Sequence, residues 1–168
     1  MFKINDYVVS GSLGVCQVID IINERSIGGE VIDYYALRPV FSNSNNMMTI
    51  KTRVNNPKVA MREVISKDDV AGLIATLPDQ ETVWIADSMQ RNEQFKSLLR
   101  TGEISELIKI VKTLYLEKKA NLAIGKNLTR TDEEMYKVAE KQLVEEFALV
   151  LDIPTDAVLP YILKQLPA

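Results

Sequence analysis

The chain has 168 residues, a formal net charge of −3 and no histidine. The missing histidine excludes catalysis by Ser-His-Asp or Cys-His groups and removes the commonest zinc ligand. No run reaches the about 18 apolar residues that a membrane span needs, and the first residues lack the apolar segment of a signal peptide. We therefore expect a cytoplasmic protein with no membrane partner.

The negative net charge argues against a protein that binds nucleic acid unaided. Neutralisation of phosphates supplies most non-specific affinity, so freestanding binders usually carry a basic balance. If this chain binds DNA, we expect another protein to bring it there.

The first part of the chain, residues 1–62, has the pattern of short β-strands separated by turns. Runs rich in β-branched residues alternate with glycine-containing turns at 11–14 and 28–29 and with a polar loop at 42–46. The expected strands are 6–9, 15–22, 31–40, 47–51 and 59–62. Five short, closely spaced strands are typical of a small, highly curved sheet or barrel.

The second part, residues 66–168, has apolar residues at the helical spacings of three and four. We expect Ser66 to cap a first helix, a second to run from near Glu81 to a terminal Gly102, and a third to start near Ile104. A capping box at 131–134 should open a fourth helix, and Pro160 should lie close to the start of a short last one. The predicted fold class is α+β, with a five-stranded β-domain before an all-helical domain.

Residues that could carry chemistry have plainer interpretations. The acidic clusters at 68–69 and 132–134 lie in first turns of predicted helices, where negative charge complements the helix dipole. The single cysteine, Cys16, lies in an apolar run and reads as a small strand residue. We therefore expect no catalytic residue, no metal and no cofactor. An enzyme whose carboxylates converge on a metal ion is the hypothesis that these residues support least.

Trp84, the only tryptophan, is followed by the basic residues Arg91, Lys96 and Arg100. One interpretation places the indole in the helical core, with a solvated basic face. The other places an apolar ring at a helix end beside basic residues, as in minor-groove proteins that lever open base steps.

A second basic group, Arg25, Arg38, Lys51 and Arg53, lies on or beside the predicted strands. Charge there can simply protect strand edges from aggregation. It can also form a protein-docking surface, because arginine anchors many interfaces.

Several short sequence motifs occur in the order in which one known family has them. They are residues 2–9, 14–15, 25–30, 34–37, 48–51 and 59–62 in the first part, then 98–103 and 131–146 in the second. In this order and spacing the chain resembles the CarD/CdnL family of RNA polymerase-binding transcription regulators, whose β-domain is shared with the transcription-repair coupling factor. The resemblance covers nearly the whole chain.

The resemblance implies a Tudor-like β-domain that docks on the β-subunit lobe of RNA polymerase, and a compact helical domain that contacts promoter DNA. Carried over by position, the docking contacts fall on Arg25 and Lys51, with Arg53 as a neighbour. The family's tryptophan wedge in the promoter minor groove corresponds to Trp84, and Arg91 is the best-matched basic residue after it.

The spacing departs from the family pattern in the helical domain. Trp84 lies one helical turn further from Gly102 than the family pattern has it, and counting back from Gly102 puts Ser88 at the wedge position. Glu93 stands where a basic residue is common, and Lys96 follows on the same predicted helix. The DNA-contacting set is therefore expected among Trp84, Ser88, Arg91 and Lys96.

The first hypothesis is a non-enzymatic regulator that stabilises the open promoter complex, with RNA polymerase and promoter DNA as partners. The alternative is a Tudor-like protein-interaction module whose helices are a scaffold without a direct DNA role. We expect a monomer in either case.

Overall fold

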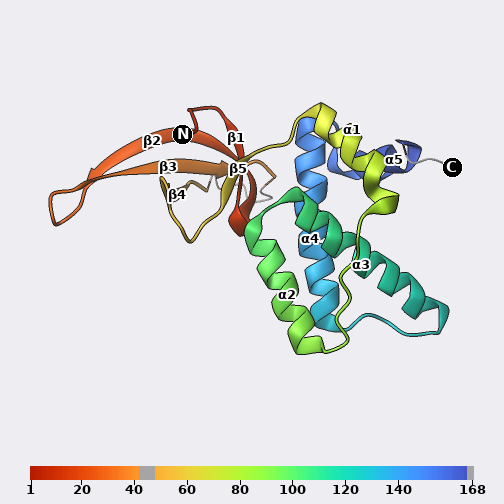
Figure 1. Ribbon diagram of the computed structural model, residues 1–168. Coiled ribbons are helices and arrows are strands. Elements are labelled where there is room, and N and C mark those ends of the chain that lie inside the picture. The colour runs from red at the N-terminus through yellow and green to blue at the C-terminus, as the bar shows by residue number, and fades with distance from the viewer. Residues whose placement is uncertain (42–47, 166–168) are drawn as a thin grey trace. The chain divides into compact units, whose positions relative to one another are not determined.

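The computed structural model describes residues 1–41 and 48–165 (Figure 1). The chain divides into two compact units, Met1–Val64 and Ile65–Ala168. Strands occupy the first unit and helices the second, so the predicted α+β fold class is confirmed.

The first unit is built on one antiparallel sheet. Within the described residues the sheet has five strands in the order β4-β3-β2-β1-β5. Their bounds are β1 (Tyr7–Ser10), β2 (Gly14–Arg25), β3 (Val31–Pro39), β4 (Ile50–Arg53) and β5 (Met61–Glu63). The strand predicted at 47–51 starts later, at Ile50, and its first residue, Met47, lies outside the described residues. The loop predicted at 42–46 also lies outside them.

β2 and β3 form a long hairpin whose far end extends past the other strands (Figure 1). Pairing continues to Arg25 opposite Val31, whereas β4 reaches only Tyr34 on β3. A register shift between Val18 and Asp20 marks a bulge, which bends a strand locally.

The core of this unit lies on the face that β2 and β3 share near β1. Its buried members are Val8, Cys16, Val18, Tyr35 and Leu37. Cys16 is therefore a buried strand residue, and the far end of the hairpin contributes nothing to this core.

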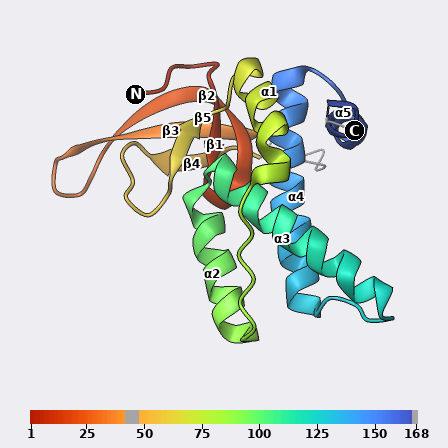
Figure 2. The same ribbon diagram turned by 45° about the vertical axis from the view of Figure 1, so that its right-hand side comes forward.

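The second unit contains α1 (Lys67–Thr76), a short 3₁₀ turn η2 (Leu77–Asp79), α2 (Ser88–Thr101), α3 (Ile104–Ala123), α4 (Arg130–Leu151) and α5 (Thr155–Gln165). α3 packs along α4, and α2 contacts both, while α5 lies beside the C-terminal part of α4 (Figure 2). The buried core between α2, α3 and α4 consists of Phe95, Leu107, Ile110, Leu114 and Ala139. None of the described helices is both long and apolar enough to cross a bilayer.

Helix ends agree with the sequence in two places. The Ser66 side chain accepts the backbone N–H of Asp69, and the Asp69 carboxylate accepts the Ser66 N–H, which completes a capping box. Gly102 ends α2 with a left-handed φ of 68°, the conformation that favours glycine.

The predicted start of the second helix is wrong. α2 begins at Ser88 rather than near Glu81, because Asp87 accepts the N–H groups of Met89 and Gln90 and so caps the helix there. Residues 80–87 consequently have no regular secondary structure, and Trp84 lies before the helix.

The cap of the fourth helix lies two residues earlier than predicted. Thr129, not Thr131, accepts the backbone N–H of Asp132, at 3.2 Å. Pro160 lies inside α5 rather than at its start. A proline lacks the N–H that would bond to the carbonyl of Asp156 one turn earlier, so α5 continues without that bond.

Candidate functional site

Lys51 and Arg53 share one face of the sheet. Lys51 is opposite Ala36, and Arg53 is opposite Tyr34 on β3. Both basic side chains are exposed. Residues paired across antiparallel strands point to the same side, so Lys51, Arg53 and Tyr34 form one surface.

Lys51 is held in place on that surface by two neighbouring strands. Its ammonium forms an ion pair with Glu24 of β2 and lies 4.8 Å from the ring centroid of Tyr34. The contact between Lys51 and Glu24 is about half exposed, so solvent screens it and it contributes little to stability. The two contacts bring a basic group beside an aromatic ring.

Arg25 lies on the opposite face from that surface. It is paired with Val31, two residues along from the pair of Asn23 and Asp33, whereas Glu24 shares the face of Lys51. Arg25 is exposed near the end of the hairpin and has no ion pair within the described part of the chain. The three expected docking residues therefore form two separate groups.

Trp84 lies in the irregular segment 80–87, which runs to the start of α2 (Figure 1). Side chains of α3 hold the first part of this segment. The Lys112 ammonium donates to the carbonyls of Leu77, Pro78 and Gln80 at 3.0, 2.9 and 2.7 Å. The buried Thr113 hydroxyl accepts the N–H of Val83 at 2.9 Å. The segment is thus fixed immediately before Trp84.

Arg91 holds the second part of the segment. Its Nη1 donates to the carbonyls of Ile85 and Ala86, at 2.8 and 3.3 Å. Its Nε and Nη2 donate to the two carboxylate oxygens of Asp132, at 3.1 and 2.8 Å. Arg91 is 4% exposed and Asp132 2%. A bidentate pair of this kind is both strong and directional.

The Arg91 guanidinium also lies over the Trp84 ring, with its central carbon 4.2 Å from the ring centroid. Trp84 nevertheless remains 42% exposed. Trp84 thus remains partly accessible to solvent although a cation lies over its ring.

The other expected DNA-contacting residues lie on the outside of α2. Ser88 is its first residue, and Lys96 lies two turns further on, with Arg100 one turn beyond; all three are exposed. Met89, Glu93, Lys96 and Arg100 follow one another at helical spacings of three and four, so they share an exposed stripe. Arg91 lies on the buried side instead, and the structure does not bring it together with Lys96.

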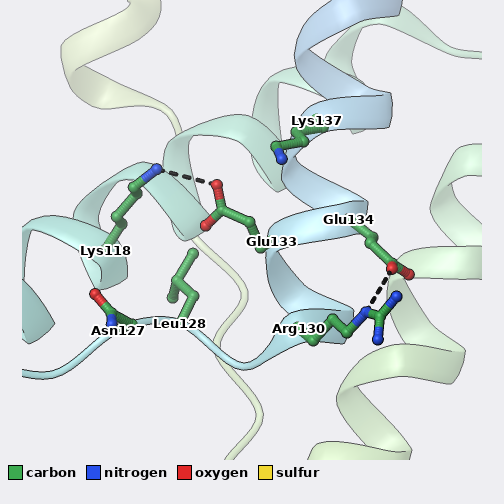
Figure 3. Close-up of a pocket in the computed structure, with 7 residues that line it drawn as sticks. All are labelled: Lys118, Asn127, Leu128, Arg130, Glu133, Glu134 and Lys137. Carbon is green, nitrogen blue, oxygen red and sulfur yellow. Dashed lines mark hydrogen bonds and ion pairs between the residues drawn. The ribbon is translucent and has the colours of Figure 1, made fainter.

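A shallow hollow lies where α3 and the start of α4 meet (Figure 3). Its lining is of mixed charge: Lys118, Asn127, Leu128, Arg130, Glu133, Glu134 and Lys137. Lys118 is paired with Glu133 and Arg130 with Glu134, so two of its cations already have partners. Among the described residues no group of three or more His, Cys, Asp or Glu side chains could hold a metal ion.

Two ionisable groups of α4 are perturbed by burial. Burial and a hydrogen bond with Glu140 raise the pKa of Tyr136, and burial raises the pKa of Glu145 against the opposing charge of Lys141. Neither residue touches Trp84 or the sheet surface in any recorded contact.

Sequence reasoning missed three side chains that build the Trp84 segment: Lys112, Thr113 and Asp132. Lys112 and Thr113 lie between the apolar residues Val111 and Leu114 of the third predicted helix, where polar residues are ordinary, and Asp132 has the simple interpretation of a first-turn charge. No signal in the sequence reveals the partners of these side chains.

The two units together define a class of protein: a small Tudor-like β-domain followed by a helical domain that presents a tryptophan. Comparison with family models agrees with this class. Residues 2–65 match the CarD-like/TRCF RID domain, and residues 72–162 match the CarD C-terminal domain. The chain belongs to the CarD family, and it is an RNA polymerase-interacting transcription regulator. These families are non-catalytic regulators. No individual curated protein matches the chain.

Proposed function

We propose that this regulator docks on the β-subunit lobe of RNA polymerase and contacts promoter DNA at the upstream edge of the melted bubble, stabilising the open complex. The observation that carries the proposal is the match of two family models, in chain order, to the β-unit and to the helical unit. The protein would act in the cytoplasm, as a monomer and without a cofactor.

The docking part of the proposal rests on the exposed basic groups of the β-unit. Lys51 and Arg53 flank Tyr34 on one face, and Lys51 is already oriented by Glu24. Arg25, exposed near the end of the hairpin, offers a second anchor on the other face. Arginine and tyrosine are both enriched among residues that dominate binding energy.

The DNA part rests on the geometry of Trp84. The three residues between Trp84 and the start of α2 form no helical turn, and the indole lies against Arg91 in the first turn of α2. The ring is thus beside the helix start although it precedes it in the chain. This placement supports Trp84 rather than Ser88 as the wedge, so Trp84 is the wedge we propose, with Ser88 and Lys96 as neighbouring contacts.

Net charge is compatible with this arrangement. A factor tethered to polymerase meets DNA at high effective concentration and needs little affinity of its own. The wedge would stabilise the open complex by binding melted DNA better than closed duplex, because a ligand shifts an equilibrium only by its differential affinity. The exposure of Trp84 supports such a role, since unstacked bases stack on aromatic side chains.

The alternative is a polymerase-binding module whose helical unit has no direct DNA role. The burial of Arg91 favours it, because a guanidinium paired with Asp132 is not available to a phosphate. The two proposals share docking and differ in whether Trp84 affects promoter opening.

Charge reversal tests the docking proposal. The double substitution Arg25→Glu, Lys51→Glu should weaken binding of the full chain to the isolated β-subunit lobe by at least about ten-fold, because contacts of opposite charge become repulsive. The matched control is Lys3→Glu, Lys58→Glu, which reverses two exposed lysines of the same unit. Binding is measured by isothermal titration calorimetry at fixed salt.

The single substitutions locate the docking face. Arg25→Glu and Arg53→Glu lie on opposite faces of the sheet by register. A large loss in one only would assign docking to that face. Equal binding by wild type, the double variant and the control would refute the proposed docking residues.

A further inference from the structure

The segment that carries Trp84 is built to hold one conformation. Residues 80–87 lack regular secondary structure, yet α3 fixes their first part through Lys112 and Thr113, and Arg91 fixes their second part. The indole is the side chain between these two sets of contacts. A segment held by side chains on both sides can present a ring without a large entropy loss when the ring binds.

Arg91 makes all of its recorded contacts inside the helical unit. Its guanidinium bonds two carbonyls of the segment and both oxygens of Asp132, and its central carbon lies 4.2 Å from the centroid of the Trp84 ring. With 4% of its surface exposed, it has almost none to offer a phosphate. A phosphate contact would require breaking a buried ion pair, which is strongly unfavourable.

We propose that Arg91, locked by Asp132, is a positioning residue that sets the orientation of Trp84, and not a phosphate contact. This rests on the proposed role of Trp84 at the promoter. The guanidinium lies over the indole, and the part of Trp84 that stays exposed is available to a base or sugar. The pair Arg91–Asp132 links α2 to the first turn of α4. The position of the Trp84 ring therefore depends on both helices.

Only arginine fits this arrangement. Its planar fork carries donors in fixed directions, so one side chain can bond a carboxylate and two carbonyls while its flat face stacks on a ring. A lysine keeps the positive charge but has a single nitrogen, which cannot reach both oxygens of Asp132, the carbonyls of Ile85 and Ala86, and the ring at once. Arg91→Lys therefore keeps the positive charge at this position and removes the contacts that depend on the shape of the guanidinium.

The experiment uses the fluorescence of Trp84, which is the only tryptophan of the chain. Quenching by acrylamide is measured on the full-length protein without DNA. Arg91→Lys should raise the quenching constant, because the guanidinium that lies over the indole is removed and more of the ring becomes accessible to acrylamide. Arg100→Lys is the matched control, since Arg100 lies on the exposed side of the same helix; it should leave quenching unchanged.

The same variants are then compared in lifetimes of open promoter complexes and in binding to the β-subunit lobe. Arg91→Lys should shorten the lifetime several-fold while lobe binding stays as in wild type. Thermal melts confirm that the helices remain folded at the working temperature. If Arg91→Lys does not fold, quenching, open-complex lifetime and lobe binding are measured on Asp132→Asn instead. A smaller rise in the quenching constant is then expected.

The outcomes separate this inference from the proposed function. Unchanged quenching in Arg91→Lys, or in Asp132→Asn where that variant replaces it, overturns the positioning role. Raised quenching with an unchanged lifetime also overturns it, provided that Trp84→Ala shortens the lifetime. If Trp84→Ala leaves the lifetime unchanged, the proposed wedge itself fails, and with it any positioning for DNA, although the quenching result still describes how the segment is held.

Discussion

Replacing Asp132 by alanine should lower the free energy of unfolding of the helical unit by about 3–5 kcal/mol, the range observed when one partner of a buried ion pair is removed. Asp132 and Arg91 are 2% and 4% exposed, and the two side chains form two hydrogen bonds. Without the carboxylate, the guanidinium stays buried with no counter-charge. Urea unfolding followed by the helical circular dichroism signal measures the loss.

Glu134→Ala is the control for that substitution. Glu134 also lies in the first turns of α4 and is paired with Arg130, but the two side chains are 66% and 94% exposed. Exposed pairs of this type contribute less than about 0.5 kcal/mol. Equal losses for Asp132→Ala and Glu134→Ala would mean that the buried pair does not hold α2 against α4.

Leu37→Ala should unfold the β-unit in a large fraction of molecules and so abolish binding to polymerase. Leu37 is fully buried in a core that also contains Val18 and Tyr35. Removing a buried leucine side chain costs about 2–5 kcal/mol. A β-unit that ends at Val64 has little stability to lose, because small domains bury a small fraction of their surface.

The matched control for that substitution is Leu13→Ala, since Leu13 is 40% exposed in the same unit. It should change polymerase binding and stability little. Binding to the β-subunit lobe and the near-ultraviolet circular dichroism of the tyrosines are measured on the full chain. Retained lobe binding in Leu37→Ala would contradict docking through the folded sheet.

The sheet could be predicted because its signals are local. β-branched runs and glycine turns place the strands of the described residues to within a few positions, and the alternation of Tyr35 and Leu37 marks the buried face. The faces of the basic residues could not be predicted. A bulge between Val18 and Asp20 shifts the register of β2 by one residue, and a one-residue shift moves every following side chain to the other face. Arg25 therefore lies opposite to Lys51.

In the helical unit, too, the sequence predicts features that depend on local residues and misses those that depend on distant ones. Ser66 and Gly102 identify their helix ends by residue type alone, because caps act within one turn. The start of α2 depends instead on tertiary contacts. Arg91 bonds Ile85 and Ala86 and pairs with Asp132, 41 residues away, which stabilises an irregular segment where the apolar spacing predicts helix. No local pattern reveals a partner at that distance.

The central claim is that a polymerase-tethered factor stabilises the open complex through Trp84. The most direct test is the lifetime of competitor-challenged open complexes with wild-type protein, Trp84→Ala and Trp84→Phe, at protein concentrations that saturate polymerase. We predict that Trp84→Ala shortens the lifetime by about five-fold or more, since a base stacked on an aromatic ring contributes about 1–3 kcal/mol, and that Trp84→Phe retains part of the effect. Lifetimes equal to wild type in both variants, with lobe binding intact, would contradict the claim and leave a docking module without a direct DNA role.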